Sequence, residues 1–219
     1  MNNADLIIAT LKANGVTRGF GIPSGNVLPL MEAMRTGGIE FVLTAHEGSA
    51  GFAADVTGRM TGAPGFCLAT LGPGATNLAT GVGGAFLDRS PVIAITCNLN
   101  TDQLGRRIQM WIDHHALFKP ITKATFKLER GCVAETLTQA IALALSEPKG
   151  PVTAPVSTLR HGAAGGGLPR AASALFRRAR ARSAQRRWAR GGGERGVGGK
   201  RTDGHRSRGR FRALHRYGL

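Results

Sequence analysis

Short apolar runs alternate with segments of helical spacing from about residue 3 to residue 155, and this alternation is what most constrains the fold. The runs IEFVLTA, GFCLATL and PVIAITC are apolar almost throughout, as is typical of strands buried on both faces of a sheet. Between such runs, apolar residues recur three and four positions apart, as in amphipathic helices. The pattern predicts an α/β fold over residues 1–158, with a doubly wound, mostly parallel sheet and helices on both faces.

Four turns directly follow predicted strands. They contain Pro23-Ser24-Gly25, His46-Glu47, Gly72-Pro73-Gly74 and Cys97-Asn98. In a parallel α/β sheet the carboxyl ends of the strands lie at one edge, and ligands bind beyond that edge. We therefore expect the four turns to converge on one edge of the sheet.

The second of these turns places a carboxylate where a helix begins. Counting from Glu47, the positions three, four, seven and eleven residues later are Ala50, Gly51, Ala54 and Gly58, so one stripe of the helix is almost bare of side chains. Two glycines inside a helix cost about 1 kcal/mol each relative to alanine. This cost suggests that a backbone, a partner subunit or a flat ligand comes close to the stripe. The alternative is a glutamate favoured by the helix dipole beside tight helix–sheet packing.

The third turn, within ATLGPGATNLATG, joins a strand to a helix through glycines and a proline. Glycine-rich turns before helices often bind phosphate groups. This turn matches neither of the common phosphate-binding glycine motifs. A tight turn that shapes the wall of a pocket is an equally good interpretation.

Basic charge is concentrated near the carboxyl terminus. The chain has a formal net charge of +16, and residues 160–219 hold 17 Lys+Arg against 2 acidic residues. This segment has no sustained helical or strand period and few large apolar side chains, so it cannot offset the entropy lost on ordering. We expect residues 159–219 to form a disordered tail behind a domain of nearly neutral charge.

Three origins are open for this tail. It is a basic arm that binds nucleic acid through phosphate contacts, a solvated tail or linker, or the product of a reading frame lost near residues 153–160. We favour the lost frame, because the strand-like GPVT passes abruptly into Arg, Gly, Ala and Pro, as out-of-frame GC-rich DNA would encode. Nucleic acid is not expected as a partner except through the tail.

The cysteines and histidines show no metal-ligand spacing. The residues concerned are Cys67, Cys97, Cys132, His46, His114 and His115. We expect buried thiols in a reducing compartment, no bound metal, and a cap by Asp113 on a short helix that starts at the histidine pair. The sequence shows no signal peptide and no apolar run of the ~20 residues that span a membrane, so we expect a soluble cytoplasmic protein without a membrane partner.

Several segments carry a resemblance to a known family. They are GIPSGNVLPLMEAM, HEGSAGFAADVTGRMTGAPGFCLATLGPGATNLATGVGGAFLDRSPVIAITC and ALFKPITKATFKL. Over roughly residues 3–155 the chain resembles the N-terminal pyrimidine-binding (PYR) domain of thiamine diphosphate-dependent enzymes. The similarity is strongest to the acetolactate synthase-like group.

The resemblance implies a catalytic role for Glu47. In the family a glutamate at this position hydrogen-bonds N1′ of the cofactor's aminopyrimidine, which promotes removal of the C2 proton of the thiazolium ring. The cofactor then acts as an electron sink in lyase or transferase chemistry on 2-oxo acids. A carboxyl group in an apolar pocket is suited to sharing a proton with a ring nitrogen. The resemblance also implies a pyrimidine pocket lined by Pro23, Ser24, Gly72, Pro73 and Asn77, and a small-residue stripe that admits a neighbouring domain or subunit.

Two positions depart from the family pattern. Asn98 follows Cys97 where close relatives have a Gly-Gln pair. Further on, IQMWIDHH keeps Gln109 but has Met110-Trp111 in place of a glutamate. The resemblance puts these positions on the substrate side, so the substrate is left open.

Family enzymes hold magnesium and the diphosphate with a Gly-Asp-Gly motif and a later asparagine in a separate domain. The closest fragment here is Thr202-Asp203-Gly204, with no asparagine after it. We therefore expect a truncated chain that binds only the pyrimidine end of thiamine diphosphate and is inactive alone. A homodimer or a full-length partner would supply the pyrophosphate-binding domain. The alternative is a non-catalytic interaction module whose arginine-rich tail binds nucleic acid or acidic surfaces.

Overall fold

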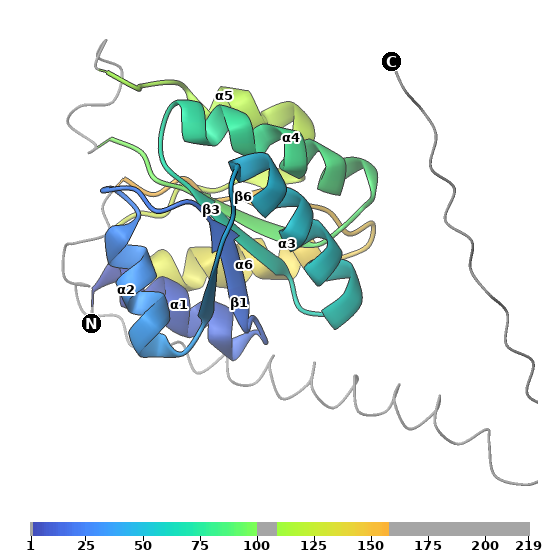
Figure 1. Cartoon of the computed structure of the whole chain (residues 1–219). Coiled ribbons are helices and arrows are strands. Elements are labelled where there is room, and N and C mark those ends of the chain that lie inside the picture. Colours follow the sequence, from blue (N-terminus) through green and yellow to red (C-terminus); the bar gives the residue numbers. More distant parts are fainter. Residues whose placement is uncertain (1, 100–108, 158–219) are drawn as a thin grey trace, which may run out of the picture. The chain divides into compact units, whose positions relative to one another are not determined.

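The structure, a computed structural model, describes residues 2–99 and 109–157 of the 219. In this part of the chain, six strands form one parallel sheet in the order β2-β1-β3-β4-β6-β5, with helices on both of its faces (Figure 1). The α/β fold expected from the sequence is confirmed. The predicted tail, residues 159–219, lies outside the described residues.

The strands are β1 (Arg18–Gly21), β2 (Glu40–Leu43), β3 (Gly65–Ala69), β4 (Val92–Thr96), β5 (Ala124–Thr125) and β6 (Val152–Thr153). The helices are α1 (Asn3–Ala13), α2 (Leu28–Gly37), α3 (Glu47–Thr61), α4 (Pro73–Leu87), α5 (His114–Phe118) and α6 (Val133–Leu145). A 3-10 turn, η2 (Lys119–Ile121), follows α5. Among the described residues, no helix combines the length and the apolar character needed to cross a membrane.

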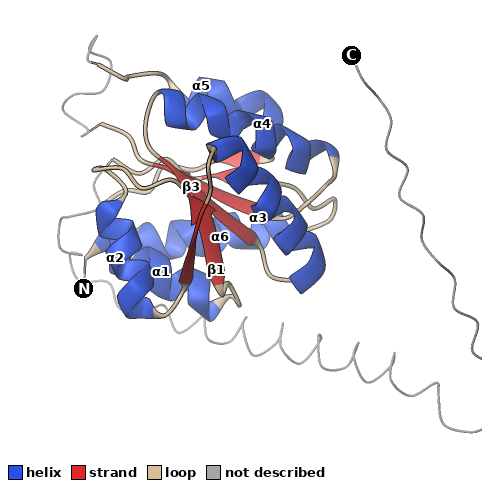
Figure 2. Cartoon of the chain, in the orientation of Figure 1, coloured by secondary structure: helices blue, strands red, loops and turns tan. Residues whose placement is uncertain are grey.

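Side chains of the central strands alternate between the two faces of the sheet. In β3, Phe66 and Leu68 join a core with α1, α2 and α6, whereas Cys67 and Ala69 join a core with α3, α4 and α5. Figure 2 shows the strands between these two groups of helices. The sheet therefore separates two cores, and they differ in character.

The core beside α1, α2 and α6, which we call the aliphatic face, is built from large side chains. Its fully buried members include Ile7, Ile8, Leu11, Leu30, Met34 and Leu137. The core beside α3 and α4, which we call the small-residue face, contains Ala50, Ala54, Ala75 and Ala85. Small side chains let helix backbones approach closely, and here they bring α3 against α4.

Glycines make the contact between α3 and α4. A Cβ atom on Gly81 would lie 2.6 Å from the Cα of Gly51 and 2.7 Å from the carbonyl oxygen of Gly48, closer than real Cβ contacts. At the other end of α3, a side chain on Gly58 would overlap the carbonyl of Pro91. The bare stripe of α3 is thus filled by this chain's own backbone. The prediction that it admits a neighbouring domain or subunit is wrong.

Candidate functional site

Parallel pairing brings the carboxyl ends of the first four strands to the same level of the sheet. Gly21 at the end of β1 pairs with Leu43 of β2 and Leu68 of β3, and Ala69 pairs with Thr96 of β4. The turns that follow these strands therefore begin side by side. The predicted convergence of the four turns on one edge is confirmed.

Glu47 is the first residue of α3, and it is buried. Its exposed fraction is only 8%, which is low for a carboxylate. The N-cap of α3 is His46, whose Nδ1 accepts a hydrogen bond of 3.0 Å from the backbone N–H of Gly48. The helix thus begins at the carboxylate, and the preceding side chain closes its first turn.

The beginning of α4 surrounds the Glu47 carboxylate. Asn77 donates a hydrogen bond from Nδ2 to Oε2 of Glu47, at 3.0 Å. A Cβ atom on Gly74 would lie 3.4 Å from Oε1 of Glu47 and 2.7 Å from Cγ2 of Thr70. Gly74 thus leaves room for the carboxylate beside α4. The Gly-Pro-Gly turn had two interpretations, a phosphate-binding turn and a tight turn that shapes the wall of a pocket. The structure supports the second, because the Glu47 carboxylate lies beside the turn.

Gly72 has a positive φ of 61°, which favours glycine. A Cβ atom there would also lie 2.6 Å from the carbonyl oxygen of Met110. Pro73 follows as the first residue of α4 and is exposed. These two residues form the turn that carries α4 to the Glu47 carboxylate.

Pro23 and Ser24 lie in the turn between β1 and α2. Pro23 is exposed and Ser24 is half-buried. The carbonyl of Ser24 accepts hydrogen bonds from the N–H groups of Val27 and Leu28, which start α2. Its Oγ is buried and, within the described residues, has no hydrogen-bond partner. No hydrogen bond in that part of the chain joins either residue to Glu47.

A pocket of about 420 Å³ lies farther along the same edge, beyond β4, β6 and β5. It is lined by Asn98, Trp111, Ile112, Asp113, His114, His115, Thr125, Phe126, Lys127, Pro155 and Ser157. Asn98 and Trp111, two of the three residues that depart from the family pattern, line this pocket, whereas Met110 and Glu47 do not. These two departures are therefore close in space although they are 13 residues apart in the chain.

His114 is buried at the start of α5. Its Nδ1 lies 2.9 Å from Oγ1 of Thr96. Burial lowers the pKa of His114 to about 4, although the negative charge of Asp113 acts to raise it. As predicted, Asp113 caps this helix, because its Oδ1 accepts a hydrogen bond from the N–H of Ala116. The imidazole is thus held neutral beside β4.

The thiols do not contribute reactive groups. Cys67 and Cys97 are buried, as expected, and burial raises the pKa of both to about 12. Cys132, which was also expected to be buried, is only half-buried, so the prediction is wrong for this residue. In the described ranges, no three His, Cys, Asp or Glu side chains group in a way that could hold a metal ion.

Comparison with known proteins identifies the family of this domain. Residues 1–117 match the family described as the thiamine pyrophosphate enzyme, N-terminal TPP binding domain. The chain belongs to this family. Members of the family bind thiamine diphosphate, so the resemblance to the pyrimidine-binding domain is confirmed.

The curated relatives of this family member include acetolactate synthases. A probable acetolactate synthase large subunit of Methanocaldococcus jannaschii is 41% identical over 153 residues, which are 69% of this chain and 26% of the relative. The acetolactate synthase isozyme 2 large subunit of Escherichia coli is 40% identical over 129 residues, 59% of this chain and 24% of the relative. Acetolactate synthase of Bacillus subtilis is 41% identical over 127 residues, which are 58% of this chain and 22% of the relative. The chain spans about a quarter of the length of these relatives.

The residues at the strand edge fit the pyrimidine end of thiamine diphosphate. A pyrimidine with an amino substituent needs both hydrogen-bond donors and acceptors around its ring. Glu47 provides a buried carboxylate, and the buried Oγ of Ser24 is free to bond within the described part of the chain. The sequence predicted both residues and placed His46 in the turn before Glu47, but it did not indicate that His46 is the N-cap of α3, because histidine is not among the preferred N-cap residues.

Proposed function

We propose that this domain is the pyrimidine half of a thiamine diphosphate site in an acetolactate synthase-like enzyme acting on 2-oxo acids, in the cytoplasm. The observation that carries the proposal is the buried carboxylate of Glu47, held by Asn77 at the carboxyl edge of the sheet. Removing a carboxylate from water is unfavourable unless it is hydrogen-bonded, so a fold that does this has a use for the group.

Each residue at this edge has a part in the proposal. Glu47 holds a proton at the ring nitrogen of the aminopyrimidine, and Asn77 keeps the carboxylate in position through Oε2. Pro23, Ser24 and the Gly72-Pro73 turn form the walls of the pyrimidine pocket. When bound, thiamine diphosphate supplies the electron sink for cleavage and formation of carbon–carbon bonds next to a carbonyl.

The ligands for magnesium and the diphosphate would lie outside these 219 residues, and a family-like dimer with a full-length subunit would bring them to the Glu47 site. The 219 residues contain no Gly-Asp-Gly motif followed by an asparagine. The Glu47 carboxylate would contact the pyrimidine end of the cofactor and would not bind its diphosphate end. We therefore propose that these 219 residues are inactive alone and act with a partner that carries the pyrophosphate-binding domain.

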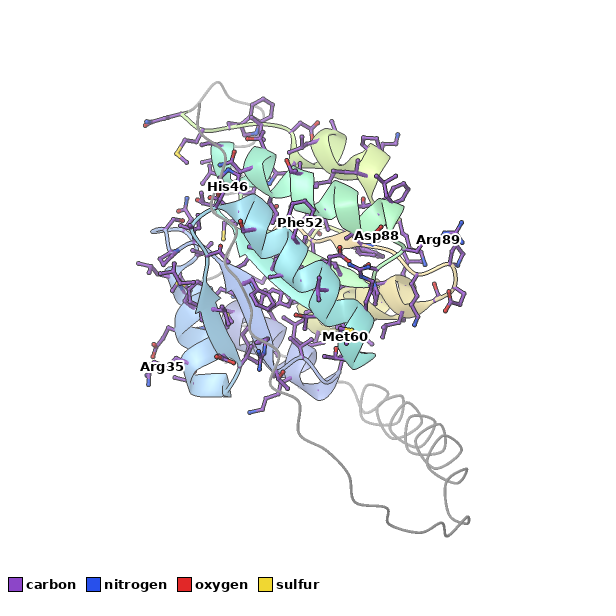
Figure 3. All side chains as sticks on the ribbon, turned by 45° about the vertical axis from the view of Figure 1, so that its right-hand side comes forward. Arg35, His46, Phe52, Met60, Asp88 and Arg89 are labelled. Carbon is purple, nitrogen blue, oxygen red and sulfur yellow. The ribbon has the colours of Figure 1, made fainter. Side chains whose placement is uncertain are left out.

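An exposed apolar surface on α3 and α4 supports such a partner. We call it the outer apolar row, and it consists of Phe52, Val56, Met60, Phe86 and Leu87. Met60 and Leu87 are 80% and 82% exposed, and Figure 3 shows Phe52 and Met60 on the outer side of α3. The Phe52 ring reaches α4, because a Cβ atom on Gly84 would lie 2.9 Å from it. Exposed apolar surface that joins two helices is typical of an interaction site.

A complementation experiment tests the proposal. A full-length acetolactate synthase subunit from the same organism would carry glutamine in place of its own glutamate at the position matching Glu47, and so be nearly inactive. Mixing it with this chain should restore activity and cofactor binding measured by calorimetry with Mg²⁺. Glu47→Gln in this chain should lower the restored activity by about 100-fold or more, the usual contribution of a proton-transfer group.

Glu135→Gln, which changes an exposed glutamate on α6, is the matched control and should restore activity fully. Restoration that survives Glu47→Gln would overturn the role of Glu47. Tight, salt-sensitive binding of duplex DNA with no effect of the cofactor would favour the interaction module instead.

A further inference from the structure

His46 occupies an unusual position for a histidine. It is the N-cap of α3, with extended backbone angles of φ −154° and ψ 143°, and its Nδ1 accepts the N–H of Gly48 at 3.0 Å. N-caps are most often Ser, Thr, Asp or Asn, whose oxygens accept this bond at any ordinary pH. An imidazole does so only while Nδ1 carries no proton, which places the proton of the neutral ring on Nε2.

The cap is connected to the Glu47 carboxylate through Gly48 and Asn77. Gly48 lies between the His46 ring and α4, because a Cβ atom on Gly48 would be 3.0 Å from Nδ1 of His46 and 3.4 Å from the carbonyl oxygen of Asn77. The same Asn77 donates its side-chain amide to Glu47. The His46 cap thus fixes the backbone of Glu47. Asn77, against which the capped turn packs, fixes its carboxylate.

From these contacts we infer that His46 is a positioning residue for Glu47, acting through the first turn of α3 and only while its imidazole is neutral. The inference rests on the proposed function, in which Glu47 faces the cofactor. When the ring takes up a proton, Nδ1 becomes a donor and the cap is lost. The new positive charge also lies at the helix N-terminus, where the dipole disfavours it.

Among the residues that the structure describes, few other charges lie on the elements next to the ring. Glu47 is its charged neighbour in the chain, and Thr44 and Ala45, which follow β2, are not titratable. On α4, which packs against this turn, residues 73–81 carry no titratable side chain. No ion pair of His46 occurs in the described part of the chain. Figure 3 shows His46 at the end of α3, so solvent protons reach it.

The test is NMR spectroscopy on the 219-residue chain without cofactor, comparing His46→Ala with His46→Asn. At pH 8, His46→Ala should speed amide hydrogen exchange at Gly48 about fivefold, the size expected for loss of an N-cap, and should shift the side-chain amide resonances of Asn77. His46→Asn should restore both, because asparagine caps well. Amides of α6 serve as an internal reference for global stability.

The pH dependence separates the imidazole from the carboxylate. Once the solution is acidic enough to protonate the imidazole, the wild-type chain should resemble His46→Ala, while His46→Asn should give the same result there as at pH 8. His115→Ala, which removes an exposed imidazole on α5, should behave as the wild type.

Each result decides the inference. Unchanged exchange at Gly48 in His46→Ala overturns it, and so do unmoved Asn77 resonances, which would leave a cap without influence on Glu47. A pH response that persists in His46→Asn assigns the titration to another group and also overturns it. Because no cofactor is present, failure of the complementation experiment alongside these shifts would refute the proposed function alone.

Discussion

The two faces of the sheet are built in opposite ways. The aliphatic face fills its space with large side chains such as Leu30, Met34 and Leu137, each with no exposed surface. The small-residue face also buries Leu78 and Phe118, but alanines and glycines line the approach of α3 to α4, which meet at Gly51 and Gly81. Buried large side chains supply most of the hydrophobic free energy of folding, whereas small ones control how closely backbones approach. The first face should therefore dominate stability, and the second should control geometry.

The two faces differ in what their buried polar groups bond. On the aliphatic face, Thr10 is buried, and its hydroxyl donates to the carbonyl of Leu6 within α1. On the other face, Glu47 is bonded by Asn77 of another helix, and Thr96 of β4 lies beside His114 of α5. Close helix packing brings Glu47 and Asn77 together, which a layer of leucines between α3 and α4 would prevent. The site and the small residues are thus parts of one arrangement.

The largest effect is expected on the aliphatic face. Leu137→Ala should lower the free energy of unfolding by about 3 kcal/mol, because it leaves a cavity in a fully buried core. Leu137→Met keeps the volume and should cost less than about 1.5 kcal/mol. Urea denaturation of the two variants measures the difference. Equal losses would mean that this face is as sensitive to shape as the other, and the contrast between the faces would fail.

A pH-dependent loss of stability should belong to the small-residue face. His114 has its pKa lowered to about 4 by burial, so the unfolded chain, with a pKa near 6.5, binds the proton first. The stabilisation is complete above pH 6.5 and is lost as the pH falls toward 4, by about 2–3 kcal/mol. Urea denaturation at pH 7 and pH 4.5 measures it.

His114→Asn should remove this share of the pH dependence, and His115→Ala should keep it, since His115 is exposed. An unchanged slope in His114→Asn would show that other groups cause the acid sensitivity. The polar character of this face would then have no consequence for stability.

The sequence predicts the aliphatic face and the carboxyl edge of the sheet well, because each depends on how apolar residues repeat along a short segment of the chain. Apolar runs place the strands, and turns that follow parallel strands must share an edge. Glu47 at the start of a helix follows from the same pattern. The element that packs against the bare stripe of α3 cannot be predicted in this way. A helical period shows which face lacks side chains but not what lies against that face.

The missed partner was another helix of the same chain. α4 carries its own glycines, and Gly81 lies against Gly51. Comparing the two helices would have suggested this pairing, since two bare stripes can pack together more closely than either can against a bulky surface. The contact between Asn77 and Glu47 is a consequence of that approach, 30 residues apart in sequence. No single-helix pattern contains it.

A smaller effect tests the geometric role of the glycines. Gly81→Ala should destabilise the chain by about 2 kcal/mol, because its Cβ would overlap the backbone of α3. It should also move the Asn77 side-chain resonances, since α4 must shift away from Glu47. Gly83→Ala is the matched control two residues away, where a Cβ atom meets only a side-chain atom of Ile121 at 3.9 Å.

The control should gain about 0.5–1 kcal/mol, the helix propensity of alanine over glycine. Denaturation curves and the Asn77 resonances report both quantities. If Gly81→Ala and Gly83→Ala behave alike, the close contact between the helices does not position the site.

The smallest change in stability is expected on the outer apolar row, beyond both cores. Met60→Gln should alter the free energy of unfolding by less than about 0.5 kcal/mol, because the side chain is 80% exposed. The same substitution should weaken association with a full-length partner in sedimentation experiments, since it removes apolar surface that only a partner can bury. Thr61→Gln, at the neighbouring exposed position, should leave association unchanged. Loss of stability without loss of association would place Met60 in a core, and α3 would then have no face left for a partner.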